Sequence, residues 1–219
     1  MMEERKQRIV EFMKQAAYKP LLFDELAVVL DVPREDRELF RSVLDELEAE
    51  GRIFKTKKNR YGIPERMNLV VGRLQGNEKG YAFVIPDDEN IKDVFISVDD
   101  MNGAMHNDRV VARINRGMTA ARRAEGEIIK ILERANNFVV GTFESSKGFG
   151  FVVPDNTKLS SDIFIPSNET NNAQTGQKVV VEITRWPEKR RSPEGRIVEI
   201  LGYKDEPGTD IISIIKAYN

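Results

Sequence analysis

The stretch before Gly51 has the hydrophobic pattern of α-helices, because its apolar residues recur every three or four positions. The first such series consists of Ile9, Phe12, Met13 and Ala16. It stops before Pro20, since a proline disfavours helical backbone in the residue that precedes it. Asp24 can cap a second helix. The apolar positions of that helix are Leu26, Ala27 and Leu30.

A third helix follows, and it has the clearest apolar face. Pro33 and Arg34 begin it, and Gly51 is expected to end it as a C-terminal cap. The apolar face consists of Leu39, Phe40, Val43, Leu44 and Leu47. The segment 53–63 then predicts a small β-hairpin with a basic tip at 57–59. Three helices and a hairpin resemble a winged helix.

Beyond Asn68 the pattern changes to short strands, in which alternate side chains point to opposite faces. The segments 79–84 and 147–152 share the order lysine, glycine, aromatic, small residue, phenylalanine and valine. Their two rings therefore lie on one face of each strand. A β-branched run with a central phenylalanine follows each segment, at 93–97 and 162–166. If the two strands of each copy pair, a third ring joins the other two.

These segments belong to an internal repeat that covers 69–132 and 138–201. Gly80 aligns with Gly148, and the alignment continues after a slip of one residue. Two small β-barrels of five strands fit this pattern best, because one face of an alternating strand can fill a barrel. The aromatic face then points outward, where grouped rings are costly unless a partner covers them. Packing of the rings against a neighbouring domain is the structural alternative.

The distribution of charge is more informative than its total. The chain of 219 residues has 34 Lys and Arg against 36 Asp and Glu, which gives a net charge of −2. The segments 52–60 and 109–123 are basic and contain no acid, whereas acids outnumber bases between 34 and 50. The third helix would thus bring negative charge to a phosphate backbone. This disfavours groove reading, and favours a packing or protein-contact role or a wing that touches RNA.

Several kinds of catalytic site lack the residues that they need. There is no cysteine, and His106 is the only histidine, so neither a zinc cluster nor a pair of catalytic histidines can form. The chain also lacks a Gly-Lys-Ser/Thr phosphate loop and the Gly-x-Ser-x-Gly elbow of serine hydrolases. The acidic segments 87–89 and 99–100 are interpreted as solvated turns rather than cation sites. The charged N-terminus and the absence of a membrane-length apolar stretch lead us to expect a cytoplasmic protein.

The aromatic segments resemble the ribonucleoprotein motifs of cold-shock domains, which are oligonucleotide-binding barrels. The segments 79–84 and 147–152 resemble the first motif, and the runs around Phe95 and Phe164 resemble the second. A winged helix, two such barrels and a final apolar strand at 211–215 together resemble the N-terminal half of the bacterial ribonuclease R family. Further matching segments are 21–27, 102–110 and 147–155.

The resemblance implies a mainly β fold with an α-rich N-terminal domain. The expected domains are a winged helix at 1–66, a first cold-shock barrel at 67–134, a second at 135–202, and at 203–219 the lead-in to an absent nuclease domain. In that family the nuclease domain binds magnesium through aspartates and degrades RNA from its 3′ end to nucleoside monophosphates. Those aspartates have no matching positions here. We therefore expect no enzyme activity, catalytic residue, metal ligand or cofactor in this chain.

The predicted function is to bind single-stranded RNA with little sequence preference and to guide it to that nuclease domain. The expected RNA-binding residues are Lys79, Tyr81, Phe83, Phe95, Phe143, Lys147, Phe149, Phe151, Phe164, Arg109 and Arg113. Phe143 is expected to add a ring to the second barrel. Two pairs of positions depart from the cold-shock pattern, which predicts weaker binding by each barrel. Ser97 and Pro166 replace a histidine, and Arg73 and Thr142 replace a tryptophan, that many cold-shock proteins have.

The predicted partners are single-stranded RNA and, through the winged helix, the ribosome or other components of RNA decay. No membrane partner is expected. The alternative function is a stand-alone regulator that binds nucleic acid, or a protein-interaction module, acting through the winged helix.

Overall fold

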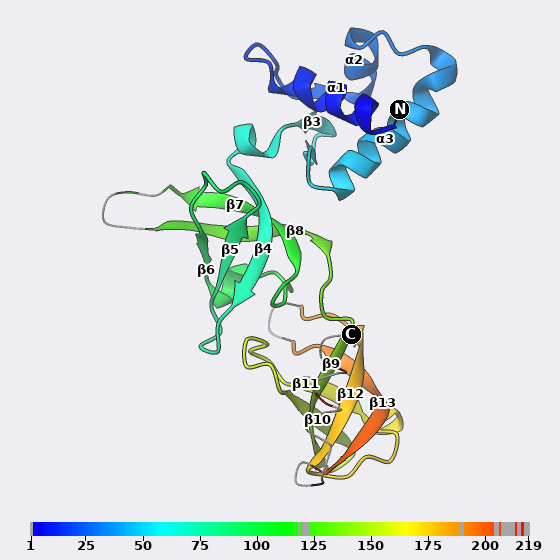
Figure 1. The fold of residues 1–219 in the computed structure, drawn as a ribbon, viewed down its shortest axis with the longest axis vertical. Coiled ribbons are helices and arrows are strands. Elements are labelled where there is room, and N and C mark those ends of the chain that lie inside the picture. The colour runs from blue at the N-terminus through cyan, green and yellow to red at the C-terminus, as the bar shows by residue number, and fades with distance from the viewer. Residues whose placement is uncertain are drawn as a thin grey trace.

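The computed structural model describes residues 2–117, 119, 123–188, 191–203, 206, 213 and 216. Three parts follow one another along the long axis of the molecule (Figure 1). The N-terminal helices lie at one end, a first barrel lies in the middle, and a second barrel lies at the other end.

The N-terminal part contains the three helices and the hairpin that the sequence predicts. The helices are α1 (Met2–Lys14), α2 (Phe23–Val29) and α3 (Arg37–Ala49), with the 3-10 helices η1 (Arg34–Asp36) before α3 and η2 (Pro64–Met67) after the hairpin. The strands β1 (Leu21–Leu22), β2 (Phe54–Lys55) and β3 (Arg60–Gly62) form an antiparallel sheet in the order β1-β3-β2. The fully buried core side chains include Met13, Leu26, Leu44, Leu47, Ile53 and Tyr61.

The structure differs from the predictions made for Asp24 and Leu39, and it confirms the prediction made for Gly51. Asp24 lies inside the first turn of α2 and forms an ion pair with Arg37, while the backbone N–H before the helix donates to Glu25. Leu39 is 38% exposed and lies outside the buried face of α3. Gly51 ends α3 as expected, with a φ of +72° that favours glycine.

The internal repeat folds into two closed five-stranded barrels, as predicted. The first consists of β4 (Leu69–Gly76), β5 (Ala82–Pro86), β6 (Val94–Ile96), β7 (Arg109–Arg116) and β8 (Ala124–Glu133), in the order β4-β5-β6-β8-β7. The second consists of β9 (Phe138–Ser146), β10 (Phe149–Pro154), β11 (Ile163–Pro166), β12 (Gln177–Arg185) and β13 (Glu194–Tyr203), in the equivalent order. In each barrel the third strand pairs parallel with the fifth, and the other pairings are antiparallel.

The two cores are packed with different residues at one pair of equivalent positions. In the first barrel Leu74 on β4 and Ala82 on β5 are both fully buried. In the second barrel their positions in the repeat are held by Phe143 and Gly150. The ring of Phe143 occupies the space over Gly150, so that a Cβ added there would lie 2.6 Å from its Cζ. The larger side chain of one strand is thus matched to the smaller residue of the next.

A buried carboxylate fixes the linker between the barrels. The side chain of Asp108 is fully buried and accepts hydrogen bonds from the backbone N–H groups of Met105 and Ala135, each at 2.9 Å. Arg134 donates to the same carboxylate at 2.9 Å, and its guanidinium lies 4.2 Å from the ring centroid of Trp186 in the second barrel. Burial raises the pKa of Asp108, while these hydrogen bonds oppose that shift. The linker is therefore held to a loop of the first barrel.

The final apolar segment, predicted as a strand at 211–215, lies outside the described residues except for Ser213. That residue is helical, so the strand prediction is wrong at this position. None of the helices in the described ranges is long and apolar enough to cross a membrane.

Candidate nucleic-acid interface

Each barrel carries three half-buried aromatic rings on its outer surface. The first platform consists of Tyr81, Phe83 and Phe95, and the second platform consists of Phe149, Phe151 and Phe164. Ring centroids are 5.6–5.7 Å apart in the first platform and 5.4–5.7 Å apart in the second. The interplanar angles also agree, at 86°, 38° and 68° against 82°, 36° and 68°. The two platforms are therefore near copies in geometry.

Strand register produces this arrangement. Phe83 lies directly opposite Phe95 across β5 and β6, and Phe151 lies opposite Phe164 across β10 and β11. The alternate side chains point into the barrels, where Ala82, Val84, Val94, Ile96, Val152, Ile163 and Ile165 are completely buried. Since successive residues of a strand face opposite sides, filling the barrels with these residues leaves the rings outside.

The turn before each platform presents a lysine. Lys79 and Lys147 are exposed, and each precedes a glycine with positive φ, +92° at Gly80 and +83° at Gly148. A Cβ added at Gly148 meets no atom within 4 Å, so the left-handed backbone, rather than lack of space, requires glycine there.

An arginine that the site prediction omitted lies over the first platform. The guanidinium carbon of Arg123 is 5.3 Å from the ring centroid of Phe83. Arg123 immediately precedes β8, whose first residues pair with β6 beside Phe95. The sequence contained the signal, because Arg123 closes the basic segment 109–123, but only the pairing of β6 with β8 brings it to the rings.

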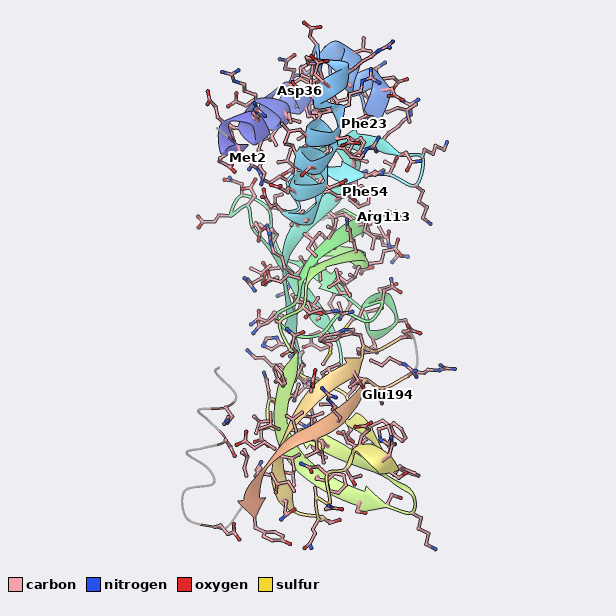
Figure 2. The ribbon with its side chains drawn as sticks, turned by 90° about the vertical axis from the view of Figure 1, so that its right-hand side faces the viewer. Met2, Phe23, Asp36, Phe54, Arg113 and Glu194 are labelled. Atoms are coloured by element: carbon pink, nitrogen blue, oxygen red, sulfur yellow. The ribbon has the colours of Figure 1, made fainter. Side chains whose placement is uncertain are left out.

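Arg109 and Arg113 do not lie at the first platform, and their role in RNA binding stays a prediction. Both are on β7, which β4 and β8 separate from the strands that carry the rings. Arg109 forms an ion pair with Asp87 at 2.7 Å, and Arg113 forms one with Glu127 at 3.1 Å. Figure 2 shows Arg113 at the end of the first barrel nearest the N-terminal helices. These cations are already paired with carboxylates of their own barrel.

Phe143 was expected to add a stacking ring, and this prediction is wrong. Its side chain is only 1% exposed and lies in the core of the second barrel. The strand register required this, because Phe143 occupies the position of the buried Leu74 in the repeat. A base cannot stack on a ring that the barrel encloses.

The side chains of His106 and Asp88 form hydrogen bonds within their own loops and turns or with neighbouring backbone. His106 is 8% exposed, and its Nδ1 accepts a hydrogen bond from the backbone N–H of Gly76 at 3.2 Å. Burial, with the nearby charge of Lys158, lowers the pKa of His106. Asp88 accepts two hydrogen bonds from Asn90 and belongs to a turn, as predicted. The described residues include no group of three or more His, Cys, Asp or Glu side chains that could hold a metal ion.

Comparison with known families identifies both barrels. Residues 72–131 match the ribonuclease B OB domain, and residues 151–219 match the cold shock domain. Ribonuclease R of Thermotoga maritima is 37% identical to this chain over 213 residues, which are 96% of this chain and 29% of that protein. The chain spans between 23% and 46% of the length of the curated relatives that it matches.

Solved structures share the fold at low sequence identity. RNase R of Mycoplasma genitalium in complex with ribose methylated single-stranded RNA matches with a TM-score of 0.57 and 18% identity, over 67% of this chain and 23% of that one. Yeast Ssd1, a pseudonuclease, matches with a TM-score of 0.59 and 21% identity, over 86% of this chain and 27% of that one.

Proposed function

The chain is homologous over most of its length to the N-terminal region of ribonuclease R, and from this premise we propose that it binds single-stranded RNA with little sequence preference. The observation that carries the proposal is the repetition of one three-ring platform in both barrels. Stacking suits such binding, because every base has a π-face, and it contributes about 1–3 kcal/mol per base. Sequence preference is low because stacking contacts the face of a base and does not read its edges.

Cations at the edge of the platforms supply the electrostatic part of the affinity. Lys79 and Lys147 are exposed on the turns that begin the aromatic strands, and Arg123 lies over Phe83. We assign phosphate contacts to the two lysines, since contacts to phosphate hold a strand without reading its sequence. Each such contact lowers the affinity by about 0.7 log units per tenfold rise in salt on a single strand.

In a protein that also carried a nuclease domain, the barrels would collect RNA and guide its 3′ end to that domain. The degradation of RNA from its 3′ end with magnesium is therefore proposed for such a full-length protein and not for the barrels. The fold alone does not imply cleavage, because yeast Ssd1, which shares it, is a pseudonuclease. We further propose the domain limits 1–66, 67–134, 135–202 and 203–219, with a winged helix as the first domain.

The N-terminal part is proposed to contact protein or RNA rather than DNA grooves. The acidic residues of α3 oppose approach to a duplex, whereas the hairpin tip places Lys57 and Lys58 in solvent. Binding of the ribosome or of RNA-decay proteins by this part stays a prediction, as does a cytoplasmic location.

The test removes one ring from each platform. Phe83→Ala combined with Phe151→Ala should weaken binding of fluorescent oligo(A) by about thirtyfold or more, from two lost stacking contacts. Phe138→Ala is the matched control, because Phe138 is 58% exposed and belongs to neither platform. Fluorescence polarisation measures both dissociation constants. An unchanged affinity in the platform variant would show that the rings do not bind RNA.

A further inference from the structure

A groove of about 320 Å³ lies on the surface of the N-terminal part, between α1 and the segment that joins α2 to α3. Its floor is apolar, because Ile9 of α1 and Phe40 and Val43 of α3 are each at most 7% exposed. Leu39 lines the groove as well and is 38% exposed. The apolar stripe of α3 thus extends beyond the packed core, and its outermost leucine faces the groove.

The apolar surface continues beside the groove. Val28 and Val29, at the end of α2, are 70% and 55% exposed, and they directly precede Leu30 of the lining. Apolar side chains that are grouped on a surface, rather than scattered singly, mark sites that bind another molecule. Figure 2 shows Asp36, which lines the groove, in the N-terminal part and well away from both barrels. Neither barrel therefore covers this surface.

Opposite charges line the two sides of the groove. Arg5 and Arg8 belong to α1, whereas Asp31 and Asp36 belong to the connection between α2 and α3, and all four side chains are exposed. Among the described residues, Arg5, Asp31 and Asp36 have no ion-pair partner. Arg8 pairs only with Glu4, at 3.2 Å on the surface, where such a pair contributes little. These charges are available to a ligand that carries both signs.

The backbone of Asp31 favours a role in recognition over a role in folding. Its φ is +52°, in the left-handed region where helices usually end with glycine or asparagine. Backbone hydrogen bonds close the turn, from Asp31 to the carbonyl of Val28 at 3.1 Å and from Val32 to that of Ala27 at 2.9 Å. The carboxylate itself forms no hydrogen bond with a described residue, and Asp36 likewise forms no capping hydrogen bond at the start of α3. An acid in this strained position costs stability, which a contact with a ligand explains.

The shape and the charges of the groove select one kind of occupant. The described lining consists of helices and a turn, and it includes no sheet edge for an extended strand to join. Asp31 and Asp36 repel the phosphates of RNA and of anionic lipids. An amphipathic helix fits, because its apolar face fills a hydrophobic groove while its two flanks carry charges of opposite sign.

We propose that this groove binds an amphipathic helix of a partner protein, with its acidic flank against Arg5 and Arg8 and its basic flank against Asp31 and Asp36. The inference deepens the proposed function, on which it rests, by naming the surface and the class of partner for the protein contacts of the N-terminal part. Because both aromatic platforms lie on the barrels, the partner and RNA bind at separate places and at the same time. The groove thus brings the RNA-binding barrels to the partner.

The probe is a designed, fluorescein-labelled peptide of about 18 residues, long enough to form a helix on binding. Leucines at every third and fourth position form its apolar face, with glutamates on one flank and lysines on the other. In fluorescence polarisation with the full chain, this mixed-charge peptide should bind about tenfold more tightly than peptides whose flanks are both glutamate or both lysine. Equal affinities of the three peptides would overturn the inference.

Two variants test the groove itself. Leu39→Ala should weaken binding of the mixed-charge peptide by about tenfold, whereas Ile200→Ala, which removes a side chain of similar exposure (36%) from the second barrel, should leave it unchanged. Asp31→Asn with Asp36→Asn should abolish the preference for the mixed-charge peptide over the glutamate peptide, since asparagine tolerates the left-handed backbone and lacks the charge. An unchanged preference, or equal effects of Leu39→Ala and its control, would contradict the proposed docking.

Further outcomes separate this inference from the proposed function. Leu39→Ala should leave the affinity for oligo(A) unchanged, and a loss of that affinity would overturn the inference by identifying RNA as the ligand of the groove. A dimer in sedimentation equilibrium that Leu39→Ala dissociates would overturn it too, because the occupant would be a second copy of this chain. If the peptides do not bind while the platform variant still loses affinity for oligo(A), the inference fails and the proposed function stands.

Discussion

The packing of the Phe143 ring over Gly150 in the second barrel leads to a quantitative prediction about stability. Gly150→Ala should destabilise the second barrel, because the added Cβ would lie 2.6 Å from Cζ of Phe143, where carbon atoms normally approach to about 3.5–4.0 Å. The enclosed ring cannot move aside, so we expect a cost in the range of about 1–3 kcal/mol that overpacked cores show. For a domain of this size that corresponds to roughly 4–8 °C in melting temperature for each kcal/mol.

Phe143→Leu completes the experiment. Alone it leaves unfilled space over Gly150 and should cost about 1 kcal/mol. Together with Gly150→Ala it recreates the leucine and alanine pair of the first barrel, Leu74 with Ala82. The double variant should therefore be more stable than the sum of the single changes predicts, by about 0.5–3 kcal/mol.

Fluorescence of Trp186 during denaturation reports on the second barrel, because it is the only tryptophan and lies beside that core. The reasoning is refuted if Gly150→Ala unfolds at the same denaturant concentration as the unmodified protein. Strict additivity of the two changes would refute it as well, since it would mean that the ring and the glycine are not packed together.

Two other predictions follow from single side chains. His106 has a lowered pKa in the folded state, so the unfolded chain binds the proton more readily. The free energy of unfolding should therefore fall as the pH is lowered below the unfolded pKa of about 6.5. His106→Gln should flatten this dependence in denaturation curves recorded between about pH 5 and 8. Arg123→Ala should weaken oligo(A) binding by about two- to fivefold from the lost contact with Phe83, whereas Arg113→Ala, the control at a paired cation, should leave the dissociation constant unchanged.

The period of the apolar residues was sufficient to predict the elements and the barrels. It placed the three helices and the hairpin, and the alternation around Phe83 and Phe151 placed the rings outside because the intervening residues had to fill a core. The same rule predicts that Phe143 is buried, since it follows the outward-facing Thr142. The error at Phe143 came from giving its aromatic character more weight than its strand position.

Other features depend on contacts between distant segments. The density of basic residues suggested Arg109 and Arg113, but their carboxylate partners, Asp87 and Glu127, are brought to them by strand pairing across the barrel. His106 is buried, and its burial depends on how the two barrels meet. Local sequence patterns do not predict the contact between the two barrels.

The unequal packing of the two cores also bears on how a tandem repeat folds correctly. Neighbouring copies of one fold can exchange strands during folding and so become trapped in misassembled states. If β5 replaced β10 in the second barrel, Ala82 would meet the ring of Phe143; if β10 replaced β5 in the first, Gly150 would leave a void beside Leu74. Both exchanged forms are therefore expected to be less stable than the native one. The buried residue of each aromatic strand, Ala82 or Gly150, thus favours pairing of that strand within its own barrel.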